Sequence, residues 1–182
     1  MSTPEAFVKK HEKQLHRLEG LVRMHLNYQQ VMFAFSRLDS MDPQDDPSRI
    51  VPFVAEVDCW TSVVAVGYGR VFTEAEGAFK MSRSKVPAQY RNTHDDVMSL
   101  RHEIYAHTGN HDEYRTRLVL EVTPHSVQIE PQYQRDIVLG ARAGWKQLLE
   151  WLDGAIQDQI TKQLMHLNTT TDREWSIKSE SN

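Results

Sequence analysis

The chain has 182 residues, of which 40% are apolar and 25% charged, and its formal net charge is −4. This length suits one domain with a sizeable core, and the single cysteine excludes an internal disulfide or a cysteine-rich zinc site. We expect a cytoplasmic protein, because the sequence has no secretory signal and no apolar run of the ~20 residues that a membrane span needs. The negative charge argues against a broad nucleic-acid surface but leaves room for a local phosphate site.

The N-terminal part of the sequence predicts two long helices. Apolar residues recur at three- and four-residue steps over 5–38, where Gly20 is a candidate for a bend. The turn-forming segment 40–48 follows. Over 49–72 the apolar residues surround the helix axis, which predicts a central buried helix. Its many β-branched residues leave a strand as the alternative.

Three features of the second predicted helix bear on function. Cys59 is expected to be a buried small hydrophobe rather than a nucleophile. Arg70 is expected to be buried and paired, with no role assigned. The Gly-Tyr-Gly-Arg sequence at 67–70 lacks the context and the lysine of a phosphate-binding loop.

The segment 78–94 has the clearest local charge bias. It contains no acidic residue, and its four basic residues are Lys80, Arg83, Lys85 and Arg91. Such a run is either a solvated loop or, in a protein that cuts RNA, a track for phosphates. Tyr90 and Tyr105 are candidates for base stacking, although packing is the alternative role for Tyr105. A third helix is predicted from 92 or 93 to 107–109, with Gly109 as its stop signal.

The rest of the chain predicts a hairpin and a last helix. Apolar and polar residues alternate on both sides of a Thr-Pro-His-Ser turn over 115–131, which is typical of a β-hairpin that packs on the helices or on a partner. The pattern over 133–167 predicts a helix of about 50 Å, and this length calls for a kink or for a partner at one end. Residues 169–182 predict a polar, mobile tail. The fold class is therefore all-α, with one domain over 1–168 made of a four- or five-helix bundle and an inserted hairpin.

The third predicted helix ends in the sequence Leu-Arg-His-Glu-Ile-Tyr-Ala-His at 100–107. This sequence resembles the HEPN superfamily, whose hallmark is an arginine and, four to six residues later, a histidine near the end of the third helix of an all-α bundle. In that family the residue after the arginine is commonly Asn, Asp or His, and here it is His102. The sequence looks most like the abortive-infection branch.

The resemblance implies a metal-independent endoribonuclease of a bacterial antiphage or toxin–antitoxin system. Its site would lie across a homodimer, with RNA as substrate, an antitoxin as a further partner, and no cofactor or metal. The chemistry agrees, because a histidine transfers protons near neutral pH and an arginine holds phosphate oxygens in a planar fork. We expect Arg101 to bind the phosphate, His107 to act as general base or acid, and His102 to orient or assist.

The same residues also allow structural roles. On an ideal helix Arg101 and His107 lie roughly 120° apart, so they converge only if the helix loosens or if they act across a dimer axis. Arg101 could instead pair with Asp58 or Glu103. The alternative functions are a non-catalytic HEPN-like module that binds nucleotide, RNA or protein, and a helical scaffold.

The four histidines in and around the third predicted helix are also candidates for metal ligands. His94, His102, His107 and His111 do not have the spacing of a recognised ligand set, so no metal site is predicted.

Overall fold

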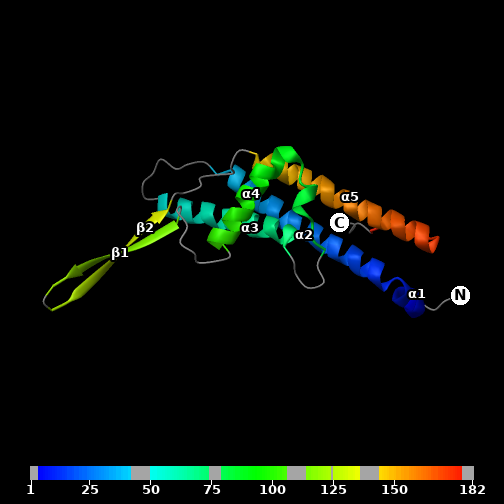
Figure 1. Cartoon of the computed structure of the whole chain (residues 1–182), viewed down its shortest axis with the longest axis horizontal. Helices are drawn as coiled ribbons and strands as arrows, with labels where there is room; N and C mark the ends of the chain where they lie inside the picture. Colours follow the sequence, from blue (N-terminus) through cyan, green and yellow to red (C-terminus); the bar gives the residue numbers. More distant parts are fainter. Residues whose placement is uncertain are drawn as a thin grey trace.

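The computed structural model describes residues 4–41, 50–73, 79–105, 114–123, 125–135 and 144–177. In these residues a helical bundle carries a two-stranded antiparallel hairpin (Figure 1), which confirms the predicted fold class. The helices are α1 (Pro4–Lys10), α2 (Glu12–Asp39), α3 (Ile50–Phe72), α4 (Arg91–Ser99) and α5 (Trp145–Thr171), and the strands are β1 (Tyr114–Val122) and β2 (Val127–Arg135).

Helix α2 is the centre of the bundle, with α3 on one side and α5 on the other. On the α3 side, Asn27 Nδ2 donates to the Gly67 carbonyl oxygen at 2.8 Å. On the α5 side, Tyr28 Oη donates to the Leu149 carbonyl oxygen at 3.0 Å. Both bonds satisfy backbone oxygens inside a layer of buried apolar side chains, which fixes the register of the three long helices. The most deeply buried of these side chains include Leu21, Val31, Tyr68, Leu148, Leu152 and Ile156.

Helix α3 is confirmed as a helix, but its predicted central position is wrong. Val64 and Tyr68 are buried against the bundle, whereas Val51 is 77% exposed and Val63 37% exposed. An all-round apolar pattern does not reveal which side of a helix lacks a neighbour, and here α3 packs on α2, on α4 and on the segment 100–105. Cys59 and Arg70 belong to the opposite side and are exposed, so their predicted burial is also wrong.

Contrary to the expectation from the sequence, α3 is long and apolar enough to cross a membrane. Within the fold, 28% of its most apolar 18-residue stretch is buried. The cytoplasmic location stays a prediction.

The first predicted helix is divided at His11 rather than bent at Gly20. His11 has φ −111° and ψ 15°, and its buried ring contacts Phe7 at a centroid distance of 4.8 Å. Helix α2 passes through Gly20 without a break. A Cβ atom at Gly20 would lie 3.2 Å from the backbone nitrogen of Phe79, so this glycine allows a close approach of the chain that follows α3.

The last helix begins twelve residues later than the predicted residue 133, at Trp145. Residues 133–135 belong to β2 instead. Gly144 precedes α5 with a left-handed φ of 95°, a conformation that glycine adopts at low cost. The helix is about 40 Å long, and its buried residues continue to Leu167. Because α5 is buried within the chain as far as Leu167, its length does not call for a partner at that end.

The start of the predicted tail is fixed to the bundle. The backbone nitrogen of Trp175 donates to Asn168 Oδ1 at 2.7 Å, and its indole nitrogen donates to Thr171 Oγ1 at 2.7 Å. The indole ring also stacks on Phe7 at 6.1 Å. The chain thus turns back over α1 after α5, and the mobility of the tail stays a prediction; the residues after 177 lie outside the described part.

The hairpin extends away from the helices at the end of the bundle opposite α1 (Figure 1). Leu120 pairs with Ile129 and Val122 with Val127, which places these four apolar side chains on one face, where each is 56–71% exposed. Thr123 closes the turn, because its Oγ1 accepts a bond from the Ser126 backbone nitrogen at 3.0 Å. The sequence analysis predicts that the hairpin packs on the helices or on a partner. The described helices do not cover this face.

Gly154, in the middle of α5, lies where a side chain has open space. A Cβ atom there would meet nothing within 4 Å. Alanine favours an α-helix over glycine, so we expect Gly154→Ala to raise the free energy of unfolding by about 0.5–1 kcal/mol. Urea unfolding monitored by circular dichroism measures this change, and an unchanged or lower midpoint would contradict it.

Candidate functional site

The predicted motif begins at a change of helix type. Helix α4 ends at Ser99, and residues Leu100–Tyr105 continue as a π-helical segment. Leu100 is 4% exposed and anchors this segment in the core. Wider π-type turns are rare and occur often at functional sites. The helix therefore loosens just before His107, although His107 itself and the predicted stop at Gly109 lie outside the described residues.

Arg101 lies against α3 in a gap that only glycine provides. A Cβ atom at Gly69 would be 2.0 Å from Arg101 Cδ and 2.7 Å from Arg101 Nε. Real side-chain atoms do not approach so closely, so the guanidinium stem rests directly on the backbone of α3. The missing side chain at Gly69 thus fixes the path of the Arg101 side chain.

Arg101 also carries an unsatisfied polar atom. Its Nε is buried and has no hydrogen-bond partner within the described part of the chain. The ion pairs between described residues do not include Arg101, so the alternative pairing with Asp58 is not formed. The Glu103 side chain lies outside the described residues. A half-buried guanidinium with an unpaired Nε is costly unless an anion reaches it.

His102, the next residue, is exposed. It therefore lies on the solvent side of the segment while Arg101 lies against α3. This placement is compatible with the assisting role predicted for it.

A buried polar pair joins α4 to α3 near this segment. His94 is 2% exposed, and its Nδ1 lies 2.8 Å from the hydroxyl oxygen of Tyr68. Its ring also contacts Phe72 edge-on at 4.5 Å. Burial lowers the pKa of His94 and raises that of Tyr68, so both side chains are neutral near pH 7. The pair holds the start of the motif helix against the part of α3 that contains Gly69.

No metal cluster is found in the described ranges: no group of three His, Cys, Asp or Glu side chains there could hold a metal ion. His94 is engaged with Tyr68. His107 and His111, which complete the histidine set considered from the sequence, lie outside the described residues.

The predicted basic track is partly engaged within the protein. Arg83 donates to both carboxylate oxygens of Asp95, with Nε–Oδ1 at 2.7 Å and Nη2–Oδ2 at 2.5 Å. The Arg83 guanidinium holds the pKa of Asp95 below its usual range. Arg91 Nε donates to the Val86 carbonyl oxygen at 3.1 Å, while Lys80 and Lys85 are exposed. The Asp95 carboxylate thus neutralises part of the positive charge of this segment. This reduces the attraction of the segment for phosphates.

The two aromatic candidates differ in what the structure describes. Tyr90 is half-buried and packs against the core, which is a structural role. The side chain of Tyr105 lies outside the described part. Gly69, by contrast, was not recognised as a site residue from the sequence. The only available signal was the paired glycines at 67 and 69, which lack the features of a phosphate loop.

Comparison of the chain with models of protein families, with curated proteins and with solved structures finds no match. The resemblance to HEPN proteins stays a prediction that rests on the motif at 100–107 and on the helix order.

Proposed function

We propose that this protein is a metal-independent, HEPN-type endoribonuclease whose phosphate-binding residue is Arg101. The observation that supports this most directly is the buried Nε of Arg101 in its gap over Gly69, which has no hydrogen-bond partner among the described residues. A phosphodiester bound by the outer nitrogens of this guanidinium would compensate its charge, which no ion pair between described residues does.

In the proposed reaction the ribose 2′-hydroxyl attacks the adjacent phosphorus atom. His107 removes the proton of the hydroxyl or delivers one to the departing 5′-oxygen, and Arg101 stabilises the charge that develops on the phosphate oxygens. The products are a 2′,3′-cyclic phosphate and a 5′-hydroxyl end. A homodimer with a two-fold axis at this site supplies two arginines and two histidines, so each proton transfer has its own imidazole.

Two features support a role of the π-helical segment in this site. It changes the helix geometry between Arg101 and Tyr105, so the separation of the two motif residues calculated for an ideal α-helix does not apply to it. It also leaves His102 exposed beside Arg101, where an imidazole can assist. We further propose that the enzyme acts in an antiphage or toxin–antitoxin setting, as the abortive-infection resemblance implies.

The test is RNA cleavage by purified protein in EDTA. Wild-type protein should release fragments that end in a 2′,3′-cyclic phosphate, and Arg101→Ala and His107→Ala should each lower the rate by at least about 100-fold. Arg23→Ala is the matched control, because Arg23 is an exposed arginine that already pairs with Glu19 at 2.7 Å.

Equal cleavage by wild type, Arg101→Ala and His107→Ala would place the activity elsewhere and overturn the assignment. RNA binding without cleavage under all conditions would favour the non-catalytic module. Light scattering during size-exclusion chromatography tests the dimer, and a monomer during active cleavage would contradict the composite site.

A further inference from the structure

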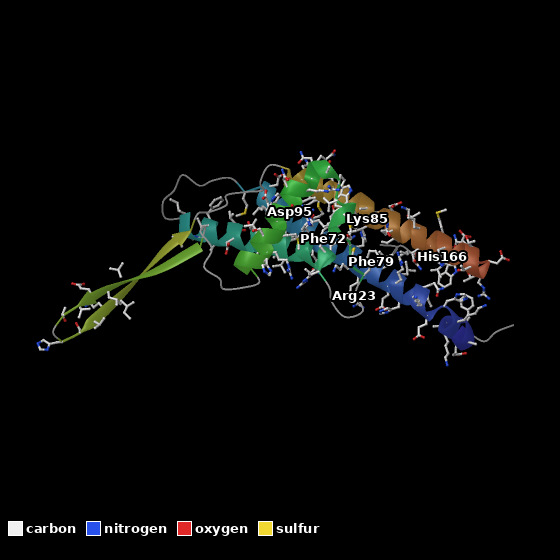
Figure 2. All side chains as sticks on the ribbon, viewed as in Figure 1. Arg23, Phe72, Phe79, Lys85, Asp95 and His166 are labelled. Atoms are coloured by element: carbon white, nitrogen blue, oxygen red, sulfur yellow. The ribbon has the colours of Figure 1, made fainter. Side chains whose placement is uncertain are left out.

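A second basic region lies along the seam between α2 and α5. There the N-terminal turns of α2 and the C-terminal turns of α5 enclose an open groove of about 480 Å³. Figure 2 labels His166 on α5 at this end of the bundle. Among the described residues no acidic side chain lines the groove, and its basic lining residues are Lys13 and Arg17 from α2 and Lys162 and His166 from α5.

The sequence spacing places these side chains in two facing rows. Lys13 and Arg17 are four residues apart on α2, and Lys162 and His166 are four residues apart on α5, so each pair occupies one face of its helix. Between the rows, Gln163 is 7% exposed and its Nε2 donates to the Gln14 carbonyl oxygen at 3.1 Å. This bond ties the floor of the groove together and fixes the spacing of the two rows.

The positive charge of the groove is only partly compensated. Asp158 pairs with Lys162, with Nζ–Oδ2 at 2.5 Å, and is the one carboxylate that contacts a basic lining residue among the described ion pairs. The Arg17 guanidinium lies over the Phe79 ring at 5.3 Å, which holds it at the rim without consuming its charge. In a chain of net charge −4, this is a local positive field in a concave surface.

We infer that this groove binds the phosphate backbone of single-stranded RNA. Its cations follow one another along the seam instead of converging on one point, which suits consecutive phosphates better than a single anion. Its lining contains no Phe, Tyr or Trp side chain, and His166 is the one aromatic ring among the lining residues, so recognition through the backbone is favoured over recognition of sequence. The choice of RNA rests on the proposed function, whereas the phosphate chemistry rests on the groove alone.

The test is fluorescence anisotropy with a labelled 12-nucleotide oligouridylate whose 2′-hydroxyls are methylated, so that the proposed reaction cannot cleave it, measured with the full chain over a series of salt concentrations. Lys13→Gln/Arg17→Gln keeps the length of both side chains and removes two charges. We expect it to weaken RNA binding about tenfold at low salt. The slope of log K against log salt should become shallower by about 1.4, because each contact to single strands contributes about 0.7.

The matched control is Arg37→Gln/Lys146→Gln, which removes the same charge from exposed positions outside the groove. If both double variants weaken binding equally, or if wild-type protein does not bind the oligonucleotide, the inference is overturned. A melting temperature equal to that of wild type shows that each variant is folded.

The outcome separates this inference from the proposed function. Binding through the groove without any cleavage overturns the nuclease and leaves the groove assignment in place. Cleavage that depends on Arg101, combined with unchanged RNA binding by Lys13→Gln/Arg17→Gln, overturns the groove assignment and leaves the proposed nuclease in place.

Discussion

Gly69→Ala should lower RNA cleavage by about 100-fold although Gly69 itself offers no chemical group to the reaction. The new Cβ atom would lie 2.0 Å from Arg101 Cδ. The atoms it meets belong to a flexible side chain, so we expect Arg101 to move out of its gap while α3 and the π-helical segment stay together. A displacement of the phosphate-binding group by an ångström or more is enough for a loss of this size. Cleavage assays in EDTA on wild type, Gly69→Ala and Arg101→Ala measure it.

Two other glycines provide matched controls for this prediction. A Cβ atom at Gly67 would lie 2.5 Å from Val31 Cγ2 in the core. Gly67→Ala should therefore cost about 1–3 kcal/mol of folding free energy but leave the rate of the folded fraction unchanged. Gly154→Ala should leave cleavage unaffected because its Cβ meets no neighbour. Full activity of Gly69→Ala would show that the position of Arg101 does not matter and would count against the proposed site.

Acidification should destabilise the protein through His94. In the folded state burial lowers the pKa of this side chain below its ordinary value of 6.5, so the folded protein binds fewer protons there than the unfolded chain. The stabilisation is fully present above about pH 6.5 and is lost as the pH falls towards the lower folded-state pKa. A charged imidazole would then be enclosed by Tyr68 and Phe72, which offer it no negative charge.

The measurement is the melting temperature between pH 7.5 and pH 5. His94→Asn does not titrate in this range and keeps a polar atom near the position of Nδ1, so we expect a lower melting temperature at pH 7.5 but a flatter pH dependence. His16→Asn replaces an exposed histidine and should keep the wild-type slope. If His94→Asn and wild type lose stability in parallel on acidification, another group is responsible.

Local sequence patterns predict where the helices and strands of this fold lie. They predict less well which neighbours cover each helix or strand. Three- and four-residue spacing locates α2, a run of helical length with apolar residues all round the axis locates α3, and alternation locates the hairpin. The true start of α5 escapes such reasoning, because residues 133–135 join β2 by pairing with Tyr114–Thr116 of the other strand. The exposure of Cys59 and Arg70 escapes it too, because it depends on which side of α3 has a neighbour.

The candidate site shows the same limit. The motif marks Arg101, but the gap over Gly69 and the ion pair between Arg83 and Asp95 arise only when separate elements meet. A basic run can be found in the sequence, whereas the carboxylate that partly neutralises it cannot be assigned to it. Likewise, the groove between α2 and α5 joins residues from opposite ends of the chain and has no local signature.

The central position of α2 has a consequence for the order in which the protein folds during synthesis. Its α3-facing side can be covered soon after α3 has been made. Its other side, which includes Tyr28, stays exposed until α5, almost the last part of the chain, has been translated. The cost of closing so long a loop makes this the late step of folding. Until then the nascent chain presents an uncovered apolar helix face to the cell, and this is the stage at which chaperones would be needed most.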